Sequence, residues 1–200
     1  MNKPISEACL RNQGPIAEAL KERLPSVAQL LEIGSGTGQH AVFCAQALPH
    51  IKWQTSDLLE NHDGMLQWIE EADLENVLPP LELDVDKTWP DFSGVSIDHV
   101  FTANTVHYIA WGSVVNMFAK VSALLPKKGL FVIYGPVNVE GQFTSEGNAG
   151  LDEWLKTCVN PLSGIKDIAA IDQLAKDLGL ALIDNLAMPA NNRLLVLQKQ

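Results

Sequence analysis

The chain has 200 residues, of which 46% are hydrophobic and 19% are charged. This length and balance are those of one globular domain that buries a substantial core without disulfides or metal ions. The formal net charge of -10 disfavours proteins that bind nucleic acid by neutralising its phosphates. We therefore expect a single domain over residues 1–200, and the charge disfavours a nucleic-acid partner without excluding one.

The cysteines and the N-terminus bear on the cellular compartment. Cys9, Cys44 and Cys158 are an odd number spread along the chain, so they predict neither a disulfide framework nor a zinc site. The five histidines show no metal-ligand spacing. The N-terminal segment lacks the roughly 20 apolar residues of a membrane span. These features predict a cytoplasmic protein with no metal and no membrane partner.

The first two thirds of the chain alternate between two kinds of segment. Short apolar runs typical of buried strands lie at 28–33, 51–55, 80–83, 97–102 and 129–135. Amphipathic segments of helix length lie between several of them, at 37–48, 61–73 and 111–125. This alternation predicts a parallel sheet with helices on both faces.

The last third of the chain has a different pattern. A helical segment at 167–178 ends at Gly179, and apolar runs follow at 180–187 and 193–198. The link between these two runs, MPANN, is too short for a parallel crossover, which needs about a dozen residues. We therefore predict an α/β fold: a Rossmann-like, seven-stranded, mostly parallel sheet with an antiparallel last strand. A polar stretch at 136–166 follows the fifth strand, where long loops are commonly functional.

The strongest chemical signal is LLEIGSGTGQH at 30–40, where an apolar strand leads into a glycine-rich loop and a helix. Gly34 and Gly36 can adopt backbone angles closed to other residues, while Gly38 permits close packing of strand against helix. An acidic residue, Glu32, stands two positions before the first glycine. This context favours a ligand-binding loop over an ordinary glycine-rich turn.

Asp57 closes the second strand, nineteen residues after Gly38. An acidic side chain at this spacing can accept hydrogen bonds from ribose hydroxyls. The alternative is an N-cap for a helix that begins near Leu58 or Glu60, and both roles can hold at once.

Polar and aromatic side chains follow the fourth strand, in ANTVHYIAW. Ligands of open α/β sheets bind beyond the carboxyl ends of the strands, which is where Asn104, Thr105, His107, Tyr108 and Trp111 are expected. His107 is the candidate general base for a reaction that removes a proton. The alternatives are that it orients a cofactor or caps the next helix.

Together these motifs resemble a family of class I S-adenosylmethionine-dependent methyltransferases, the methyltransferase-like twenty-six family, a domain of unknown function. The similarity covers nearly the whole chain and includes RNQGPI, EIGSGTGQH, ANTVHYIAW, YGP, FTSEGNA and MPANNRLLVLQ. The family usually has a serine at Gly147 and a bulky aromatic residue at Leu151, so the contacts of those two side chains differ here.

The resemblance implies methyl transfer from S-adenosylmethionine to an unidentified small-molecule acceptor. It places Asp84 beside the adenine amine with the amide of Val85 nearby, although a solvated turn aspartate is the alternative. The segment 1–25 would cover the cofactor, and 136–166 would face the acceptor. The implied cofactor-binding residues are Arg11, Asn12, Glu32, Gly34, Ser35, Gly36, Gly38, Asp57, Leu58, Asp84, Val85 and Asn104. The implied catalytic residues are His107, Tyr134 and Asn104, and the implied substrate-binding residues are Trp111, Glu146, Asn148, Asn191 and Asn192.

Two other functions remain open at this point. A nicotinamide-dependent oxidoreductase would place glycines and a ribose-binding acid similarly. The Gly-x-Gly-x-Gly spacing, the antiparallel C-terminal pair and the lack of a Tyr-x-x-x-Lys pair favour the methyl donor. A cofactor-binding protein without catalysis is the second alternative, because fold does not dictate function. Convergence of the polar residues 140–148 and Asn191 and Asn192 with His107 would favour an enzyme.

Overall fold

The structure is a computed structural model and describes residues 3–87 and 89–200. The chain divides into two compact units: the N-terminal unit ends at Phe101, and the C-terminal unit begins at Thr102. The strands form a seven-stranded sheet in the order β3-β2-β1-β4-β5-β7-β6. Strand β4 (His99–Ala103) crosses the boundary between the units.

The pairing of the strands confirms the predicted fold class. In the N-terminal unit β1 pairs in parallel with both β2 and β4, and β2 pairs in parallel with β3. In the C-terminal unit β7 runs antiparallel to both β5 and β6. The last strand is therefore the reversed one, as the short MPANN link predicts. The architecture is a Rossmann-like mixed sheet.

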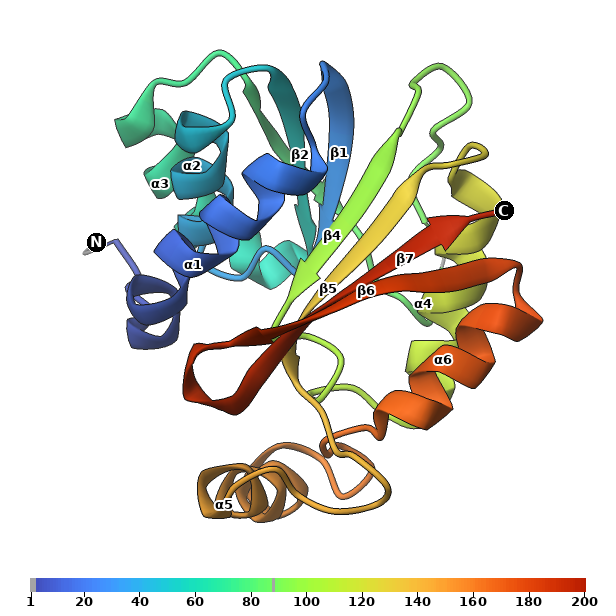
Figure 1. Cartoon of the computed structure of the whole chain (residues 1–200). Helices are drawn as coiled ribbons and strands as arrows, with labels where there is room; N and C mark the ends of the chain where they lie inside the picture. The colour runs from blue at the N-terminus through green and yellow to red at the C-terminus, as the bar shows by residue number, and fades with distance from the viewer. Residues whose placement is uncertain (1–2, 88) are drawn as a thin grey trace. The chain divides into compact units, whose positions relative to one another are not determined.

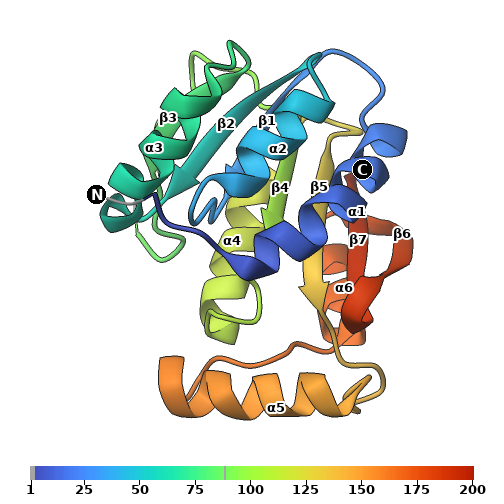
Figure 2. The same cartoon turned by 90° about the vertical axis from the view of Figure 1, so that its left-hand side faces the viewer.

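The N-terminal unit is built of three helices and three strands, followed by β4. Its helices α1, α2 and α3 lie on the same side of its strands (Figures 1 and 2). Their bounds are α1 Glu7–Arg23, β1 Ala28–Ile33, α2 Gln39–Ala47, β2 Ile51–Asp57, a 3-10 turn Leu59–Asn61, α3 His62–Ala72 and β3 Val77–Glu82. Strand β2 is buried at every position except Lys52, as expected of an interior strand of a parallel sheet.

The C-terminal unit carries the antiparallel strands and a helical insertion. Helices α4 and α6 lie beside β5, β7 and β6, and α5 lies beyond the carboxyl end of β5 (Figures 1 and 2). Their bounds are α4 Trp111–Leu124, β5 Leu130–Pro136, α5 Glu146–Trp154, a π-helical turn Leu155–Val159, α6 Ile168–Asp177, β6 Leu180–Met188, a 3-10 turn Pro189–Asn191 and β7 Asn192–Lys199. Strand β5 is buried throughout, and Phe131 packs edge-on against Phe118 of α4.

The third strand differs from its prediction. The apolar run at 80–83 predicts a strand that ends at Asp84, whereas β3 starts at Val77 and ends at Glu82. The strand includes Pro79 and Pro80, which lack the amide that a central strand needs. They are tolerated because β3 is an edge strand. Asp84 therefore lies in the turn after the strand.

The N-terminal segment contains a helix that the sequence pattern does not indicate. Helix α1 starts after Ser6, whose side chain accepts a hydrogen bond from Cys9 N, and it accommodates Pro15 within its length. Its buried residues, such as Ile16 and Leu20, anchor it in the N-terminal unit. None of the helices described within 3–87 and 89–200 is long and apolar enough to cross a membrane.

Candidate active site

The glycine loop between β1 and α2 has the strained backbone that its sequence predicts. Gly36 and Gly38 have φ angles of 57° and 85°, in the left-handed region that other residues avoid. A Cβ on Gly38 would lie 2.8 Å from Met65 Cγ, so this glycine lets α3 pack closely against the loop, whereas the prediction concerned packing of strand against helix. A Cβ on Gly36 would have no atom within 4 Å. The loop therefore presents open space at Gly36.

The end of β2 holds this loop in place. The carbonyl oxygen of Ser56 accepts hydrogen bonds from Gly34 N and Ser35 N, both at 3.0 Å. The Asp57 carboxylate accepts a hydrogen bond from Gly36 N at 2.6 Å. These bonds fix the amides of the loop before any ligand binds.

Glu32 is turned into the core of the N-terminal unit. Only 1% of its surface is exposed, and its Oε2 accepts hydrogen bonds from Ser35 Oγ at 3.0 Å and Trp53 Nε1 at 2.9 Å. Burial raises the pKa of this carboxyl to about 7, although the two donors act in the opposite direction. Glu32 thus anchors the glycine loop to β2 from beneath.

Asp57 both closes the loop and keeps some capacity for a ligand. Its Oδ1 accepts hydrogen bonds from Leu58 N at 2.7 Å and Asn61 Nδ2 at 2.8 Å, in addition to the Gly36 bond on Oδ2. A carboxylate offers about four acceptor positions, so one more donor, such as a hydroxyl, can bind. Asp57 is not the N-cap of the following 3-10 turn, because Leu58 occupies that position.

The predicted cofactor-binding residues of α1 differ in their exposure. Arg11 is exposed, whereas Asn12 is buried and its Oδ1 lies 2.6 Å from His40 Nε2. Since an amide oxygen only accepts, His40 donates from Nε2, and Nδ1 faces Cys9 Sγ at 3.7 Å. Burial lowers the pKa of His40 to about 4, so this ring is neutral. Asn12 therefore joins α1 to α2.

Pro4 and Ser6, just before α1, are also held within this unit. Ser6 N donates to Gln39 Oε1 at 2.5 Å, and Trp68 Nε1 donates to the carbonyl oxygen of Pro4 at 2.7 Å. These bonds link the residues before α1 to α2 and α3. The segment that the sequence assigns to covering a cofactor is thus packed beside the glycine loop, since Gln39 also accepts from Thr37 Oγ1.

Asp84 lies at an open hollow of about 450 Å³, after β3. Its Oδ1 accepts a hydrogen bond from Asp86 N at 3.0 Å, and its Oδ2 lies 3.0 Å from Lys87 Nζ. These contacts hold its pKa below the usual range. The volume is within the range of ligand pockets. The residues that line the hollow are Leu81, Glu82, Asp84, Lys87, Trp89 and Pro90.

In the C-terminal unit, the end of β4 joins the end of β5. Asn104 has a φ of 56°, a left-handed conformation that asparagine tolerates, and its amide donates to Tyr134 O at 2.9 Å. The Tyr134 side chain is only 2% exposed. His107 follows in a turn closed by the bond from Tyr108 N to Thr105 O. The structure thus gathers the backbone of the predicted catalytic residues.

His107 packs against β5, where a Cβ on Gly135 would lie 3.4 Å from its Nδ1. Burial and, to a smaller extent, the nearby Lys166 lower the pKa of His107 to about 4, so its imidazole is neutral at physiological pH. It does not cap the following helix, because Ala110 is the N-cap of α4.

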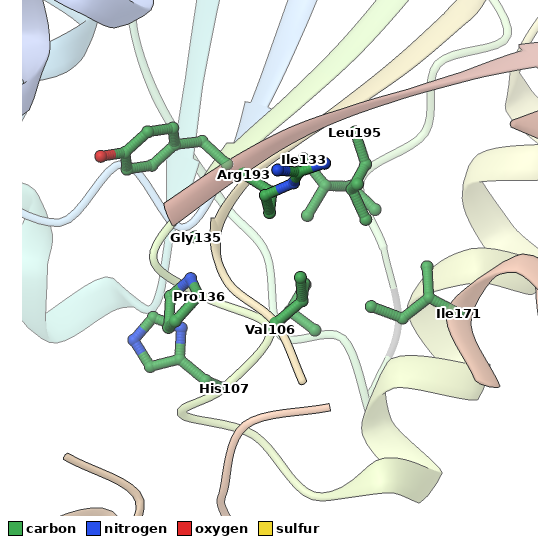
Figure 3. Close-up of a pocket in the computed structure, with 10 residues that line it drawn as sticks. Val106, His107, Ile133, Gly135, Pro136, Ile171, Arg193 and Leu195 are labelled. Carbon is green, nitrogen blue, oxygen red and sulfur yellow. The ribbon is translucent and has the colours of Figure 1, made fainter. Parts of the chain in front are cut away.

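A hollow of about 10 Å³ lies next to His107, with room for about one water molecule. Figure 3 shows Val106, Ile171 and Leu195 around it, with the His107 ring at its edge. Its lining is mainly hydrophobic, and it is far too small for an organic acceptor. A substrate of His107 would have to approach from outside this hollow.

The predicted acceptor-side residues converge only in part. Asn148 is buried at the start of α5, and its Nδ2 donates to Thr144 Oγ1 at 2.8 Å and to Asn191 O at 3.4 Å. Asn192 lies at the first position of β7, opposite Pro136, and its side chain closes the β6–β7 turn. Glu146 and Trp111 are exposed on their helices.

Sequence reasoning missed the residues that hold the His107 loop. Lys166 Nζ donates to Ile109 O at 2.8 Å, and the buried Asp152 accepts from Ile165 N at 2.7 Å. No motif marks either residue, because single lysines and aspartates are common on surfaces. In the described part of the chain, no group of three His, Cys, Asp or Glu side chains is arranged to hold a metal ion.

Several solved O-methyltransferase structures share this fold. The mitomycin 7-O-methyltransferase MmcR has a TM-score of 0.82 at 15% identity, covering 96% of this chain and 54% of that one. An O-methyltransferase family protein from Burkholderia thailandensis has a TM-score of 0.80 at 18% identity, with coverages of 97% and 58%. An O-methyltransferase family 2 protein from Planctomyces limnophilus DSM 3776, in complex with apigenin, has a TM-score of 0.76 at 15% identity, with coverages of 94% and 62%.

At these identities the likeness shows the fold, and this chain spans little more than half the length of those structures. The shared fold is the one of these solved methyltransferases and of the S-adenosylmethionine-dependent methyltransferase SibL. Residues 3–199 match a family described as a protein of unknown function, DUF938. The chain therefore belongs to the DUF938 family.

Proposed function

We propose that this protein is an S-adenosylmethionine-dependent methyltransferase that acts on a small-molecule acceptor. The observation that carries the proposal is the glycine loop, which is open at Gly36 and held in a ligand-ready form by Asp57. Two of the similar structures support a small acceptor, since their names mention mitomycin and apigenin. We propose further that the chain is a member of the methyltransferase-like twenty-six family, which its motifs resemble.

The donor site in this proposal lies in the N-terminal unit. The open face at Gly36 admits a ligand to the loop, and the remaining acceptor position of Asp57 suits a ribose hydroxyl. Asp84 borders a hollow of suitable size for the adenine. S-adenosylmethionine would supply the methyl group on a sulfonium. The further donor-side residues of this unit are Arg11, Asn12, Glu32, Gly34, Ser35, Gly38, Leu58 and Val85.

The acceptor site in this proposal lies in the C-terminal unit. A neutral His107 can accept a hydrogen bond from the attacking group and orient it. A base whose conjugate acid has a pKa of about 4 is weak, so orientation contributes more than full proton removal. The further residues assigned to this side are Asn104, Tyr134, Trp111, Glu146, Asn148, Asn191 and Asn192.

The proposal also covers the compartment in which the protein acts and the roles of its two outer segments. The protein acts in the cytoplasm as one catalytic domain over residues 1–200, and its acidic charge of -10 disfavours nucleic acid as the acceptor. Of the two residues of α1 assigned to the cofactor, Arg11 is the exposed one, and we propose that it reaches the bound cofactor. The stretch 136–166 faces the acceptor.

Calorimetric titration with S-adenosylmethionine, S-adenosylhomocysteine and NAD tests the donor site. We expect the two adenosyl compounds to bind and NAD not to bind. Gly36→Val would weaken adenosyl binding at least tenfold, because its side chain fills the open face of the loop. Binding of NAD alone would make the protein resemble an oxidoreductase instead.

A matched control separates ligand exclusion from backbone strain. Gly141 also has a positive φ, 74°, and open space around its Cβ position. Gly141→Val should therefore carry a similar strain but leave adenosyl binding unchanged. Equal loss of binding in both variants would contradict the proposed site. Binding that never yields S-adenosylhomocysteine with any of a panel of phenolic, amine and thiol acceptors would favour a sensor without catalysis.

A further inference from the structure

One short segment of the C-terminal unit holds the loop that carries His107. We call residues 163–166, with the sequence SGIK, the clamp. It donates hydrogen bonds to three successive carbonyl oxygens of the loop. The pairs are Gly164 N to His107 O, Ser163 Oγ to Tyr108 O, and Lys166 Nζ to Ile109 O.

These carbonyls lie outside the hydrogen-bond ladder of the helix that follows. The ladder of α4 begins with the bond from Val114 N to Ala110 O, so the three preceding carbonyls need other donors. A carbonyl oxygen that loses its donor is left without a hydrogen-bond partner, which is unfavourable. The clamp therefore defines the conformation of the loop, and with it the position of the His107 ring.

The clamp is itself held by residues that precede it in the stretch 136–166, which we call the insertion. Asp152 of α5, which is 5% exposed, accepts Ile165 N at 2.7 Å with Oδ1 and pairs with Lys156 at 2.5 Å with Oδ2. A Cβ on Gly164 would lie 2.7 Å from Asp152 Oδ1, so only glycine fits at this contact. Asn138, just after β5, donates from Nδ2 to Ile165 O. The insertion thus bears on His107 through the clamp.

Lys166 occupies the central position in this arrangement. Its Nζ joins both sides of the contact, with bonds to Ile109 O at 2.8 Å and Gly164 O at 2.7 Å. Burial lowers its pKa to about 8, while Asp152 acts in the opposite direction. Its cation also lies close enough to His107 to disfavour the imidazolium.

We infer that Lys166 is a positioning residue, which fixes the orientation of the His107 imidazole by tying Ile109 O to Gly164 O. The effect of Lys166 on methyl transfer rests on the proposed function. Its effect on the orientation of the His107 ring does not, because no cofactor takes part in these contacts. Asp152 supports the same position by holding the backbone between Gly164 and Lys166.

The test uses the full chain, labelled with 15N histidine and free of cofactor. Ring nitrogen spectra are recorded from pH 4 to 8, with His107 identified by its loss in His107→Gln. Lys166→Met should change the ring signals of His107, raise its pKa and speed hydrogen exchange of the Gly164 amide at least tenfold. Lys166→Arg, which keeps the charge and the donors, should restore all three. Arg193, which lines the hollow beside His107, is retained in every variant.

The His40 ring of the N-terminal unit is the internal control and should not change. If Lys166→Met lowered the melting temperature but left the His107 ring and the Gly164 amide as in the wild type, Lys166 would be merely structural. Failure of Lys166→Arg to restore them would equally overturn the inference. Should Lys166→Met not fold, Ser163→Ala, which removes the bond to Tyr108 O, must accelerate Gly164 exchange.

Calorimetry with S-adenosylmethionine on the same samples distinguishes the two proposals. A wild-type protein that binds no adenosyl ligand but shows the His107 response would disprove the function and leave the positioning role intact. A protein that binds the ligand without that response would disprove the positioning role alone.

Discussion

The two units build their candidate sites over different distances along the chain. In the N-terminal unit Asp57 reaches the amide of Gly36 across 21 residues, from one strand to the loop of its neighbour. In the C-terminal unit Lys166 reaches Ile109 across 57 residues, and Asn148 reaches Asn191 across 43. A site built within one β-α-β unit is visible as a motif, whereas a site assembled by an insertion is not.

The units also differ in the groups that they bury. The N-terminal unit buries an acid and a base: the pKa of Glu32 is raised to about 7, and that of His40 is lowered to about 4. Between pH 4 and 7, burial of neutral His40 makes stability rise with pH, whereas burial of protonated Glu32 makes it fall. In the C-terminal unit, His107 has a pKa of about 4 with no such acid to balance it. Between pH 4 and 6.5, His107 should therefore make the stability of the protein rise with pH.

The largest expected effect concerns the glycine loop. Gly38→Ala should lower the free energy of unfolding by about 3 kcal/mol, because it adds overpacking against Met65 to the strain of a left-handed alanine. Gly36→Ala adds only the strain and should cost about 1 kcal/mol. Urea unfolding at pH 7 measures both. An equal loss of unfolding free energy in both variants would show that Met65 moves aside without a measurable cost.

The pH dependence of stability separates the two units. Between pH 4 and 6.5 the unfolded chain protonates His107 and the folded chain does not, so unfolding takes up a proton and stability rises with pH. His107→Gln should remove about 1.4 kcal/mol per pH unit from this slope, or roughly 2–3 kcal/mol between pH 6.5 and 4.5. Urea unfolding at several pH values in this window measures the slope.

The controls for this slope lie in the N-terminal unit. His40→Gln should flatten it in the same direction, because the pKa of His40 is also lowered to about 4. Glu32→Gln should steepen it, because a carboxyl with its pKa raised to about 7 is protonated in the folded chain and ionised in the unfolded one. If all three substitutions acted with one sign, the contrast between the units would be wrong.

A smaller effect is expected at the clamp. Asp152→Ala should cost about 2 kcal/mol, because it leaves the buried amide of Ile165 without an acceptor. Asp172→Ala is the matched control, since Asp172 also pairs with a lysine four residues later, at 2.6 Å, but its side chain is 26% exposed against 6% for Asp152. The control should cost less than about 0.5 kcal/mol. Thermal unfolding of both variants measures their melting temperatures. Equal decreases would show that the bond to Ile165 contributes nothing to stability.

The smallest effects are expected at two helix N-caps, one in each unit. Ser145 Oγ accepts Asn148 N at 3.1 Å at the start of α5, and Ser6 Oγ accepts Cys9 N at 3.4 Å at the start of α1. Ser145→Ala should cost about 1 kcal/mol and Ser6→Ala somewhat less, because the longer bond is weaker. Circular dichroism during urea unfolding measures both. If Ser6→Ala were more destabilising than Ser145→Ala, hydrogen-bond length would not predict the contribution of these two N-caps.

The sequence by itself determined the parts of this protein that depend on local patterns. The run at 28–33 coincides with β1, and the short MPANN link correctly predicts the antiparallel pair β6 and β7. The pattern also predicts that a side chain at Gly38 would hinder packing, although the neighbour in the structure is Met65 of α3 and not the strand. Each of these features is fixed by residues close together in the chain, through backbone conformation or connection length.

Only the tertiary structure decided how the side chains of the site are used. Glu32 turns inward to Trp53, a contact that its motif does not reveal. The helix α1 is held by contacts such as the bond between Asn12 and His40, which no periodicity reveals. Lys166 reaches Ile109 because the insertion folds back from β5. Such bonds join segments far apart in the chain, and their partners are set by packing, which local sequence does not specify.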